Sequence, residues 1–376
     1  MIFRIIKSLK LRLKLLWNYI NIKQLSGKKS SIEGSFVHFD LKDLGLESYY
    51  CYLILSFLEN GYSVSIRDNV WFIANCRSHM RLLIINNNIP IIKRTKGLSI
   101  LGTFLIYDLE TNLKGLSWKK IIHVNLNIYQ AKNKIHLSMP YQMSPHIYLS
   151  DSHHSVIDFR NQLRSMKIFF SGNQDPQAYG SMIYRLFFDK MNRLEILAQI
   201  RSELKETQLS SEVPSKDQRY LNKMVLLDWS WSSEASRNLN KRIDNHHWLS
   251  QMAQSHFFLC PPGIRTPFCH HTIESMSVGT IPILEYPELF DPPLIHMKNA
   301  ICFSGPKDLV EKIELVLSLD VSVILEMSKL VADYYDDFLQ LSRTPTQIIN
   351  ADSDRLELYI NGEEKSYTQA MRELLN

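Results

Sequence analysis

The sequence has few cysteines, and none of them stands in a metal-binding or redox spacing. The five cysteines are scattered over 376 residues without a C-x-x-C pair. This pattern excludes a disulfide scaffold and does not indicate a zinc or dithiol centre, so we expect a reduced, cytoplasmic protein. Hydrophobic residues make up 45% and charged residues 22% of the chain, a composition that argues against disorder and for a folded enzyme or receptor.

Acidic residues are missing from the first 30 positions, which hold eight of the 43 lysines and arginines. The remaining residues carry 35 basic and 38 acidic side chains, so the body of the protein is close to neutral. A nucleic-acid-binding domain needs a basic face on the folded domain itself. We therefore expect no nucleic-acid partner.

The basic N-terminal segment, residues 1–30, has the pattern of an amphipathic helix. Its apolar face contains Ile2, Ile5, Ile6, Leu9, Leu13, Leu16, Trp17 and Ile20, and its opposite face gathers Arg4, Lys7, Lys10 and Lys14, with Arg12 at the border. Such a helix is too charged to span a membrane or to act as a secretory signal. It predicts a peripheral attachment of residues 1–24 to an anionic membrane surface. The alternative is a helix that packs on its own protein.

A chain of this length favours two domains. The first shows a strand at 35–40, a helix at 48–59 closed by Asn60-Gly61, and a strand at 62–66, with further β-rich runs at 81–86, 121–129 and 135–140. The second shows short apolar strands at 167–173, 223–227, 256–260, 280–284 and 300–303, typical of a buried parallel sheet. We expect domains at 31–150 and 167–325, a linker at 151–166, and C-terminal helices at 326–376.

The most informative stretch is 257–286, which predicts a strand, a Gly/Pro loop, a short helix, a glycine stop and a second strand. In an open α/β sheet, ligands bind where strands end and where the following helix presents its positive end. Arg265 in the loop would add a cation suited to a phosphate, and His270 or His271 could donate to the same group. Glu274, one turn further, could accept hydrogen bonds from sugar hydroxyls.

These residues resemble a known family. Glu274-x-x-x-x-Gly279 followed by Ile281-Pro-Ile283 resembles the donor-site signature of GT-B glycosyltransferases, and Phe258-Leu-Cys-Pro-Pro-Gly263 is similar to their exostosin-like branch. The resemblance implies an α/β fold of two Rossmann-like domains that face a central cleft, with a C-terminal helix that crosses back. The donor would bind in the second domain and the acceptor in the first.

The same resemblance implies roles for individual residues. Glu274 would bind the ribose, Arg265 and His271 would bind the diphosphate, and the turn Ser171-Gly172-Asn173 would lie near the phosphates. Exostosin-like proteins carry an arginine where this chain has His271, so the nucleotide stays open. The predicted donor site contains Ser171, Gly172, Asn173, Gly263, Arg265, His270, His271, Glu274 and Ser275.

The chemistry expected is metal-independent sugar transfer from a nucleotide sugar to a glycan or lipid-linked acceptor, with no cofactor. Fixed cations and a helix N-terminus can stabilise the charge of the leaving diphosphate. An inverting enzyme also needs a base on the first domain. Asp40 and Asp43, after the first strand, are the candidates, with His38 and Glu47 behind them.

Other interpretations remain open from the sequence. His270 and Glu274 have the i, i+4 spacing of two metal ligands, but no third ligand matches. Three basic residues before the strand at 256–260 either form a solvated helix face or bind the diphosphate: Arg237, Lys241 and Arg242. A protein that binds nucleotide sugars without turning them over, or an epimerase, would use the same architecture. The basic N-terminal segment favours a transferase that works at a membrane over these alternatives.

Overall fold

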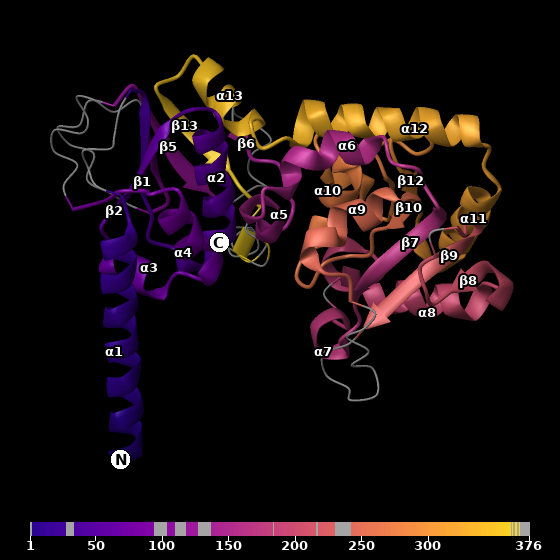
Figure 1. Cartoon of the computed structure of the whole chain (residues 1–376), viewed down its shortest axis with the longest axis horizontal. Helices are drawn as coiled ribbons and strands as arrows, with labels where there is room; N and C mark the ends of the chain where they lie inside the picture. The colour runs from indigo at the N-terminus through magenta and orange to yellow at the C-terminus, as the bar shows by residue number, and fades with distance from the viewer. Residues whose placement is uncertain are drawn as a thin grey trace. The chain divides into compact units, whose positions relative to one another are not determined.

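A computed structural model shows two compact units (Figure 1). The first unit contains Met1–Pro140 and Leu341–Asn376, and the second contains Tyr141–Gln340. None of the helices among the described residues combines the length and the hydropathy that a membrane crossing requires. The structure describes residues 2–27, 34–93, 104–109, 118–126, 137–182, 184–215, 217–229, 242–361, 363, 365, 366 and 368.

The described residues of the first unit form a parallel sheet with the strand order β3-β2-β1-β4-β5-β13-β6. All five residues of its central strand β1 are buried, as expected for a parallel strand covered on both faces. The strands are β1 (Phe36–Asp40), β2 (Ser63–Arg67), β3 (Ile91–Ile92), β4 (Phe104–Tyr107), β5 (Lys120–Asn125), β6 (Leu137–Ser138) and β13 (Arg355–Tyr359).

The helices of this unit are α1 (Ile2–Leu25), α2 (Glu47–Glu59), α3 (Val70–Asn75), α4 (Ser78–Asn86) and α13 (Arg343–Asn350), with a short 3-10 turn at Leu44–Leu46. The prediction of a β-rich run at 81–86 was wrong, because these residues complete helix α4. Met80, Leu83 and Ile84 follow helical spacing and are fully buried. Burial of this apolar stripe outweighs the strand preference of the isoleucines.

The C-terminal segment returns to the first sheet as a strand. β13 pairs in parallel with β5 on one side and with β6 on the other. The C-terminal segment therefore returns to the first unit as expected, but the return begins at Leu341 and not at residue 326. It contains the strand β13 where only helices were expected. The segment reads Arg-Leu-Glu-Leu-Tyr, so apolar residues alternate with charged ones as in a half-buried strand.

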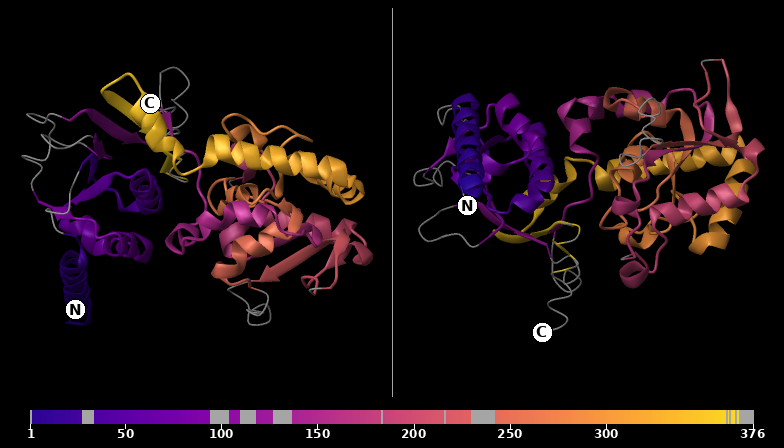
Figure 2. Two further views of the ribbon diagram at one scale, coloured as in Figure 1. Left: turned by 45° about the horizontal axis from the view of Figure 1, so that its top comes forward. Right: turned by 90° about the horizontal axis from the view of Figure 1, so that it is seen from below.

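Helix α1 is attached to its unit through residues of its second half. Ile22 is buried, Asn18 donates to the Ala74 carbonyl at 3.3 Å, and Lys23 pairs with Asp68. The first half extends beyond the other elements of the unit (Figure 1; Figure 2, left). Over residues 10–25, whose side chains the structure describes, the face opposite these contacts is exposed.

The described residues of the second unit form another parallel sheet, with the order β12-β11-β10-β7-β9-β8. The order places β7 and β10 side by side in its centre, where Phe169 and Phe258 pair in register. The strands are β7 (Met166–Asn173), β8 (Leu209–Ser210), β9 (Tyr220–Trp229), β10 (Ser255–Leu259), β11 (Ile281–Leu284) and β12 (Ile301–Cys302). These strands confirm the predicted series of buried parallel strands.

Helices cover this sheet. Helix α10 packs with α9 and α12, and α8 packs with α11. The helices are α5 (Pro145–Leu149), α6 (Val156–Arg160), α7 (Pro176–Tyr179), α8 (Arg193–Glu203), α9 (Trp248–Ala253), α10 (His270–Ser277), α11 (Gly305–Ser318) and α12 (Val321–Tyr334). Short 3-10 turns lie at Ser152–Ser155, Glu206–Gln208, Asn245–His247 and Pro287–Leu289, and π-helical turns at Tyr184–Phe188 and Tyr335–Leu339.

The segment 151–166, expected to be a linker, belongs to the second unit, and the chain divides at Pro140 and not at residue 150. Arg164 is the physical reason. Its buried guanidinium donates to the carbonyl oxygens of Ala253, Ser255, Val278 and Gly279 and to the hydroxyl of Thr280. A residue that joins α9, β10 and the end of α10 in this way fixes its own segment to the core of the unit.

Candidate functional site

The carboxyl end of β7 and the start of α10 meet at one edge of the second sheet. Ser171 and Gly172 lie near the end of β7, and α10 begins at His270 without a side-chain cap on its first amides. Uncapped amides at a helix start attract anions, and the carboxyl edge of a parallel sheet is where α/β proteins bind ligands. The local folding predicted for 257–286 therefore positions a ligand site.

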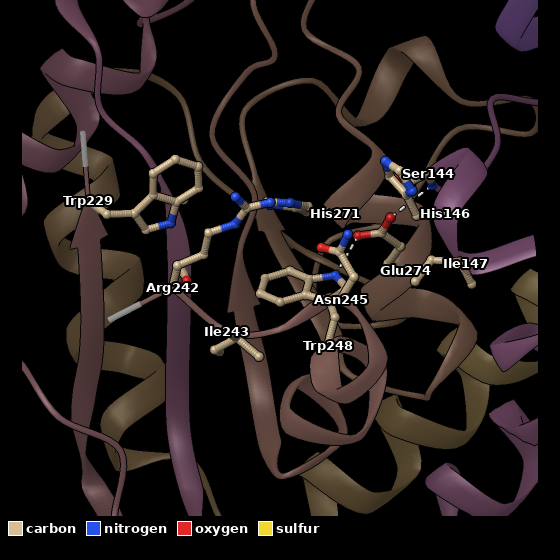
Figure 3. Close-up of a pocket in the computed structure, with 12 residues that line it drawn as sticks. Ser144, His146, Ile147, Trp229, Arg242, Ile243, Asn245, Trp248, His271 and Glu274 are labelled. Atoms are coloured by element: carbon tan, nitrogen blue, oxygen red, sulfur yellow. Dashed lines mark hydrogen bonds between the residues drawn. The ribbon is translucent and has the colours of Figure 1, made fainter. Parts of the chain in front are cut away.

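A cavity of about 140 Å³ opens at this edge (Figure 3). Its wall combines a carboxylate, imidazole and indole rings and one guanidinium, contributed by segments far apart in the sequence. It is lined by Ser144, His146, Ile147, Ser171, Gly172, Trp229, Arg242, Ile243, Asn245, Trp248, His271 and Glu274. Four residues of the predicted donor site, Ser171, Gly172, His271 and Glu274, are thus brought together.

Glu274 is held rigidly at the wall of this cavity. Its side chain is 1% exposed, and its two carboxylate oxygens accept from the Ser144 amide at 2.9 Å and from the Trp248 indole N–H at 2.7 Å (Figure 3). Burial raises the pKa of Glu274, and His270, the Ser144 amide and the Trp248 indole counteract part of that rise. Each oxygen keeps a lone pair for a ligand hydroxyl, so Glu274 is oriented in advance as an acceptor.

His271 faces the same cavity as a neutral ring. Burial lowers its pKa to about 3, and the positive charge of Arg193 adds to the effect. Its ring lies against Trp248, with the ring centres 4.7 Å apart, and against Phe258. His271 can therefore donate or accept one hydrogen bond at neutral pH, but it carries no charge there.

The remaining predicted donor residues lie outside the cavity. His270 bonds through Nδ1 to the Gln142 carbonyl at 2.8 Å and stacks on Tyr141. The Asn173 side chain accepts a hydrogen bond from the Asp175 amide and so caps the following turn. Ser275 is buried, and its hydroxyl donates to the Thr272 carbonyl. The Gly263 carbonyl accepts from the Tyr184 hydroxyl, and a Cβ there would approach the Phe268 carbonyl oxygen to 2.5 Å.

Arg265 is also not brought to Glu274. It lines a second cavity, of about 580 Å³, together with Ile264 and the loop around helix α7. The residues of that loop are Asp175, Pro176, Gln177, Ala178, Gly180 and Ser181. Sequence proximity in the 260–269 loop did not translate into proximity in the site, because the loop turns away before α10 begins.

Two other arginines supply positive charge at the first cavity. Arg242, for which the sequence left two interpretations open, lines the cavity over the Trp229 ring at 5.4 Å. Arg237 and Lys241 lie outside the described residues. The sequence reasoning missed Arg193, which begins α8, although a basic residue in the first turn of a helix is unfavourable to the helix dipole and could have marked it.

Arg193 is buried directly behind Gly172. It donates to the Asn173 carbonyl at 3.2 Å, and its guanidinium lies over the Tyr179 ring at 3.8 Å. Within the described part of the chain no carboxylate pairs with it, and its Nε has no partner. A Cβ on Gly172 would lie 3.4 Å from Arg193 Nη1, so the glycine allows the charge to approach the cavity wall.

The two candidate bases belong to the first unit. Asp40 is buried and pairs with Arg67, and Asp43 accepts from the Gly45 amide at 2.9 Å and pairs with Lys365. His38 is also buried, and its Nδ1 forms a hydrogen bond with the Ser65 hydroxyl at 2.8 Å. The third carboxylate in this group, Glu47, accepts from the Arg77 amide. Each of these side chains has a structural partner.

The i, i+4 pair His270 and Glu274 does not form part of a metal site in the described ranges. No cluster of three ligating side chains in these ranges includes either residue. His270 points to a carbonyl and Glu274 to two N–H donors.

No protein-family model matches the chain, and neither does any curated protein. Similar solved structures include a glycosyltransferase from Rickettsia africae ESF-5, with 10% identity over 85% of this chain and 100% of that one and a TM-score of 0.47. They also include Anabaena HepE in complex with UDP, with 10% identity over 84% and 98% and a TM-score of 0.42. MurG from Acinetobacter baumannii matches with 9% identity over 80% and 95% and a TM-score of 0.38.

The strand order carries the fold assignment independently of these likenesses. Two parallel α/β sheets, with the last strand of the chain returned to the first sheet, are present in the described residues. This is the GT-B fold. The exostosin-like branch suggested by residues 257–286 stays a prediction.

Proposed function

We propose that this chain is a glycosyltransferase that takes a sugar from a nucleotide-sugar donor and transfers it to a glycan or lipid-linked acceptor. The observation that carries the proposal is the fixed carboxylate of Glu274 in a cavity that also holds indole rings and a guanidinium. A ribose needs hydroxyl acceptors, a base needs an apolar or aromatic wall, and a diphosphate needs positive charge. The cavity offers all three.

The donor binds without a metal in this proposal. Arg242 at the cavity and Arg193 behind Gly172 supply the positive charge that stabilises the leaving diphosphate, together with the first amides of α10. Neutral His271 donates one hydrogen bond to the same group. Glu274 accepts from the ribose hydroxyls, in line with the family resemblance of its segment.

A matched pair of buried glutamates tests the donor site. Glu285, like Glu274, accepts from two N–H groups, here the amides of Met191 and Gly305, but it does not line the cavity. We expect one of UDP, GDP, CMP, ADP or dTDP to raise the thermal midpoint of the wild type. At 100 times its Kd, the nucleotide should increase the free energy of unfolding by about 2.7 kcal/mol. Glu274→Gln should abolish this shift, and Glu285→Gln should keep it.

The same measurement distinguishes the possible failures. EDTA should leave the shift unchanged, and a loss of the shift in EDTA would contradict the metal-independent donor site. A nucleotide shift that survives Glu274→Gln would place the donor elsewhere. A wild type that no nucleotide stabilises would contradict the proposed function itself.

The proposed acceptor lies at an anionic membrane surface, to which α1 attaches. The described part of its predicted apolar face is exposed, with Leu13 at 58%, Leu16 at 52% and Trp17 at 65%. Lys10, Arg12 and Lys14 are exposed beside it. Helix α3, which packs on α1, adds the exposed side chains of Val70 and Trp71. Apolar side chains flanked by cations are typical of an interfacial helix.

Vesicle binding tests this attachment. The triple substitution Leu13→Gln, Leu16→Gln and Trp17→Gln should weaken sedimentation with phosphatidylserine vesicles at least about tenfold, because each exposed apolar side chain contributes roughly 1.5–3 kcal/mol on burial. The control is Val321→Gln with Leu325→Gln, which removes two exposed side chains from α12 in the second unit. Equal binding by the triple variant and the wild type would refute the attachment.

A further inference from the structure

A row of polar side chains crosses one face of the first sheet near the carboxyl ends of its strands. Asp40 pairs in register with Tyr107, Tyr107 with His123, and His123 with Glu357. Arg67 extends the row on the other side through its ion pair with Asp40. The row therefore spans five neighbouring strands, from β2 to β13.

Toward the starts of β1, β4 and β5 the same face is apolar. Phe36, Leu105 and Trp118 form a buried cluster there, and Ile121 packs against it. Ile121 and His123 are two residues apart on β5 and so point to one side. On these three strands the face therefore changes from apolar to polar toward the carboxyl ends.

His123 and Glu357 form a dyad within this row. His123 Nδ1 lies 3.0 Å from one carboxylate oxygen of Glu357, and their side chains are 32% and 44% exposed. Asn125 donates to the same carboxylate at 3.2 Å. A carboxylate only accepts hydrogen bonds, so Nδ1 carries the proton and Nε2 of the neutral ring carries a lone pair. A base oriented by a third group is the usual arrangement for proton abstraction.

The neighbours of the dyad suit a carbohydrate. The Tyr107 ring lies 5.0 Å from the His123 ring and offers an aromatic surface to the C–H face of a sugar. Next to it, Arg67, held by its ion pair with the buried Asp40, supplies a donor for hydroxyls. Arg67 is 43% exposed, so the row can be reached from solvent at both ends.

We infer that this row binds the hydroxyl-bearing acceptor and that His123, positioned by Glu357, accepts the proton of the attacking hydroxyl. The inference rests on the proposed function. In a single displacement, the acceptor oxygen forms a bond to the anomeric carbon, and the bond from that carbon to the phosphate oxygen breaks. The electron pair leaves with the nucleoside diphosphate, and the proton moves to His123 Nε2. Glu357 stabilises the resulting imidazolium.

The test measures nucleoside diphosphate release from the nucleotide sugar whose nucleotide stabilises the wild type, with p-nitrophenyl glycosides as surrogate acceptors. His123→Gln should lower the rate roughly 10²-fold or more and leave the nucleotide-induced thermal shift intact. His123→Ala should regain part of the rate in added imidazole. Glu357→Gln should lower the rate as well, because the imidazolium loses its counter-charge, and Glu357→Asp should keep part of the rate.

Arg355→Gln is the matched control. Arg355 is exposed on β13, two residues before Glu357 and on the same face, but outside the polar row. Its substitution should leave the rate of nucleoside diphosphate release unchanged. A protein that binds the nucleotide yet shows the same release in wild type and His123→Gln would overturn the inference. A wild type that no nucleotide stabilises would instead contradict the proposed function.

Discussion

Replacing Arg164 with methionine is expected to destabilise the second unit by about 3–5 kcal/mol. The guanidinium is the shared donor for carbonyl oxygens at the end of α9, in β10 and at the end of α10. Burial lowers the pKa of Arg164 to about 10, so the group stays charged at neutral pH. Methionine fills similar space but leaves these buried acceptors without their donor.

Arg160 provides the comparison for this substitution. It lies in the same segment and forms a two-pronged ion pair with Asp336, which is partly exposed. Arg160→Met should cost less, about 1–2 kcal/mol, because it removes a partly exposed ion pair and one hydrogen bond to the Ser277 carbonyl. Urea unfolding monitored by tryptophan fluorescence measures both. If Arg164→Met lay within about 1 kcal/mol of the wild type, the role of Arg164 as the connector of this unit would be disproved.

Acidification from pH 7 to pH 5 is expected to lower the free energy of unfolding by several kcal/mol, with about 2 kcal/mol from His38 alone. Burial lowers the pKa of His38 and of His256 to about 4 and that of His271 to about 3. The charges of Arg164 and Lys167 at His256 and of Arg193 at His271 act in the same direction. At His38 the carboxylate of Asp40 opposes the effect of burial in part, and Arg67 adds a smaller lowering.

The direction of this change in unfolding free energy follows from proton binding. Between the ordinary histidine pKa of 6.5 and these lowered values, the unfolded chain binds more protons than the folded one. Stability is therefore complete above pH 6.5 and is lost as the pH falls toward 4. The raised pKa values of Glu47, Glu274 and Glu285 oppose this loss in part, because these carboxyls bind protons more readily in the folded state.

A pair of histidine variants isolates the effect. His38→Gln should reduce the difference in unfolding free energy between pH 7 and pH 5, because glutamine does not titrate. His246→Gln, at an exposed position, should leave the difference unchanged. Chemical denaturation at the two pH values measures both. An unaltered pH dependence in His38→Gln would show that its burial does not control acid stability.

The fold was predictable where one local signal dominates. Strands β7, β10 and β11 and residues 224–227 of β9 are apolar runs buried on both faces, and such runs can be predicted from the sequence alone. Helix α4 was mistaken for a strand because its isoleucines favour strands while its burial follows helical spacing. The ends of the two units were misplaced because the contacts of Arg164 and the pairing of β13 connect residues far apart in the chain.

The candidate site was predictable only along one segment. Residues 257–286 contain a strand, a loop and a helix whose order indicates a ligand edge, so Glu274 and His271 could be named from local pattern. The partners that orient Glu274 could not, because Ser144 and Trp248 lie 130 and 26 residues away. The dyad of His123 and Glu357 spans 234 residues and depends on the register of β13.

The return of β13 also sets an order of events during synthesis. The chain that leaves the ribosome first contains β5 and β6, but the strand that joins them follows after the 200 residues from 141 to 340. At about 5–20 residues per second, that interval lasts roughly 10–40 s. Until then β5 is an open sheet edge, while the second unit is contiguous and can complete its own sheet. The part of the protein made first is therefore the part that finishes folding last.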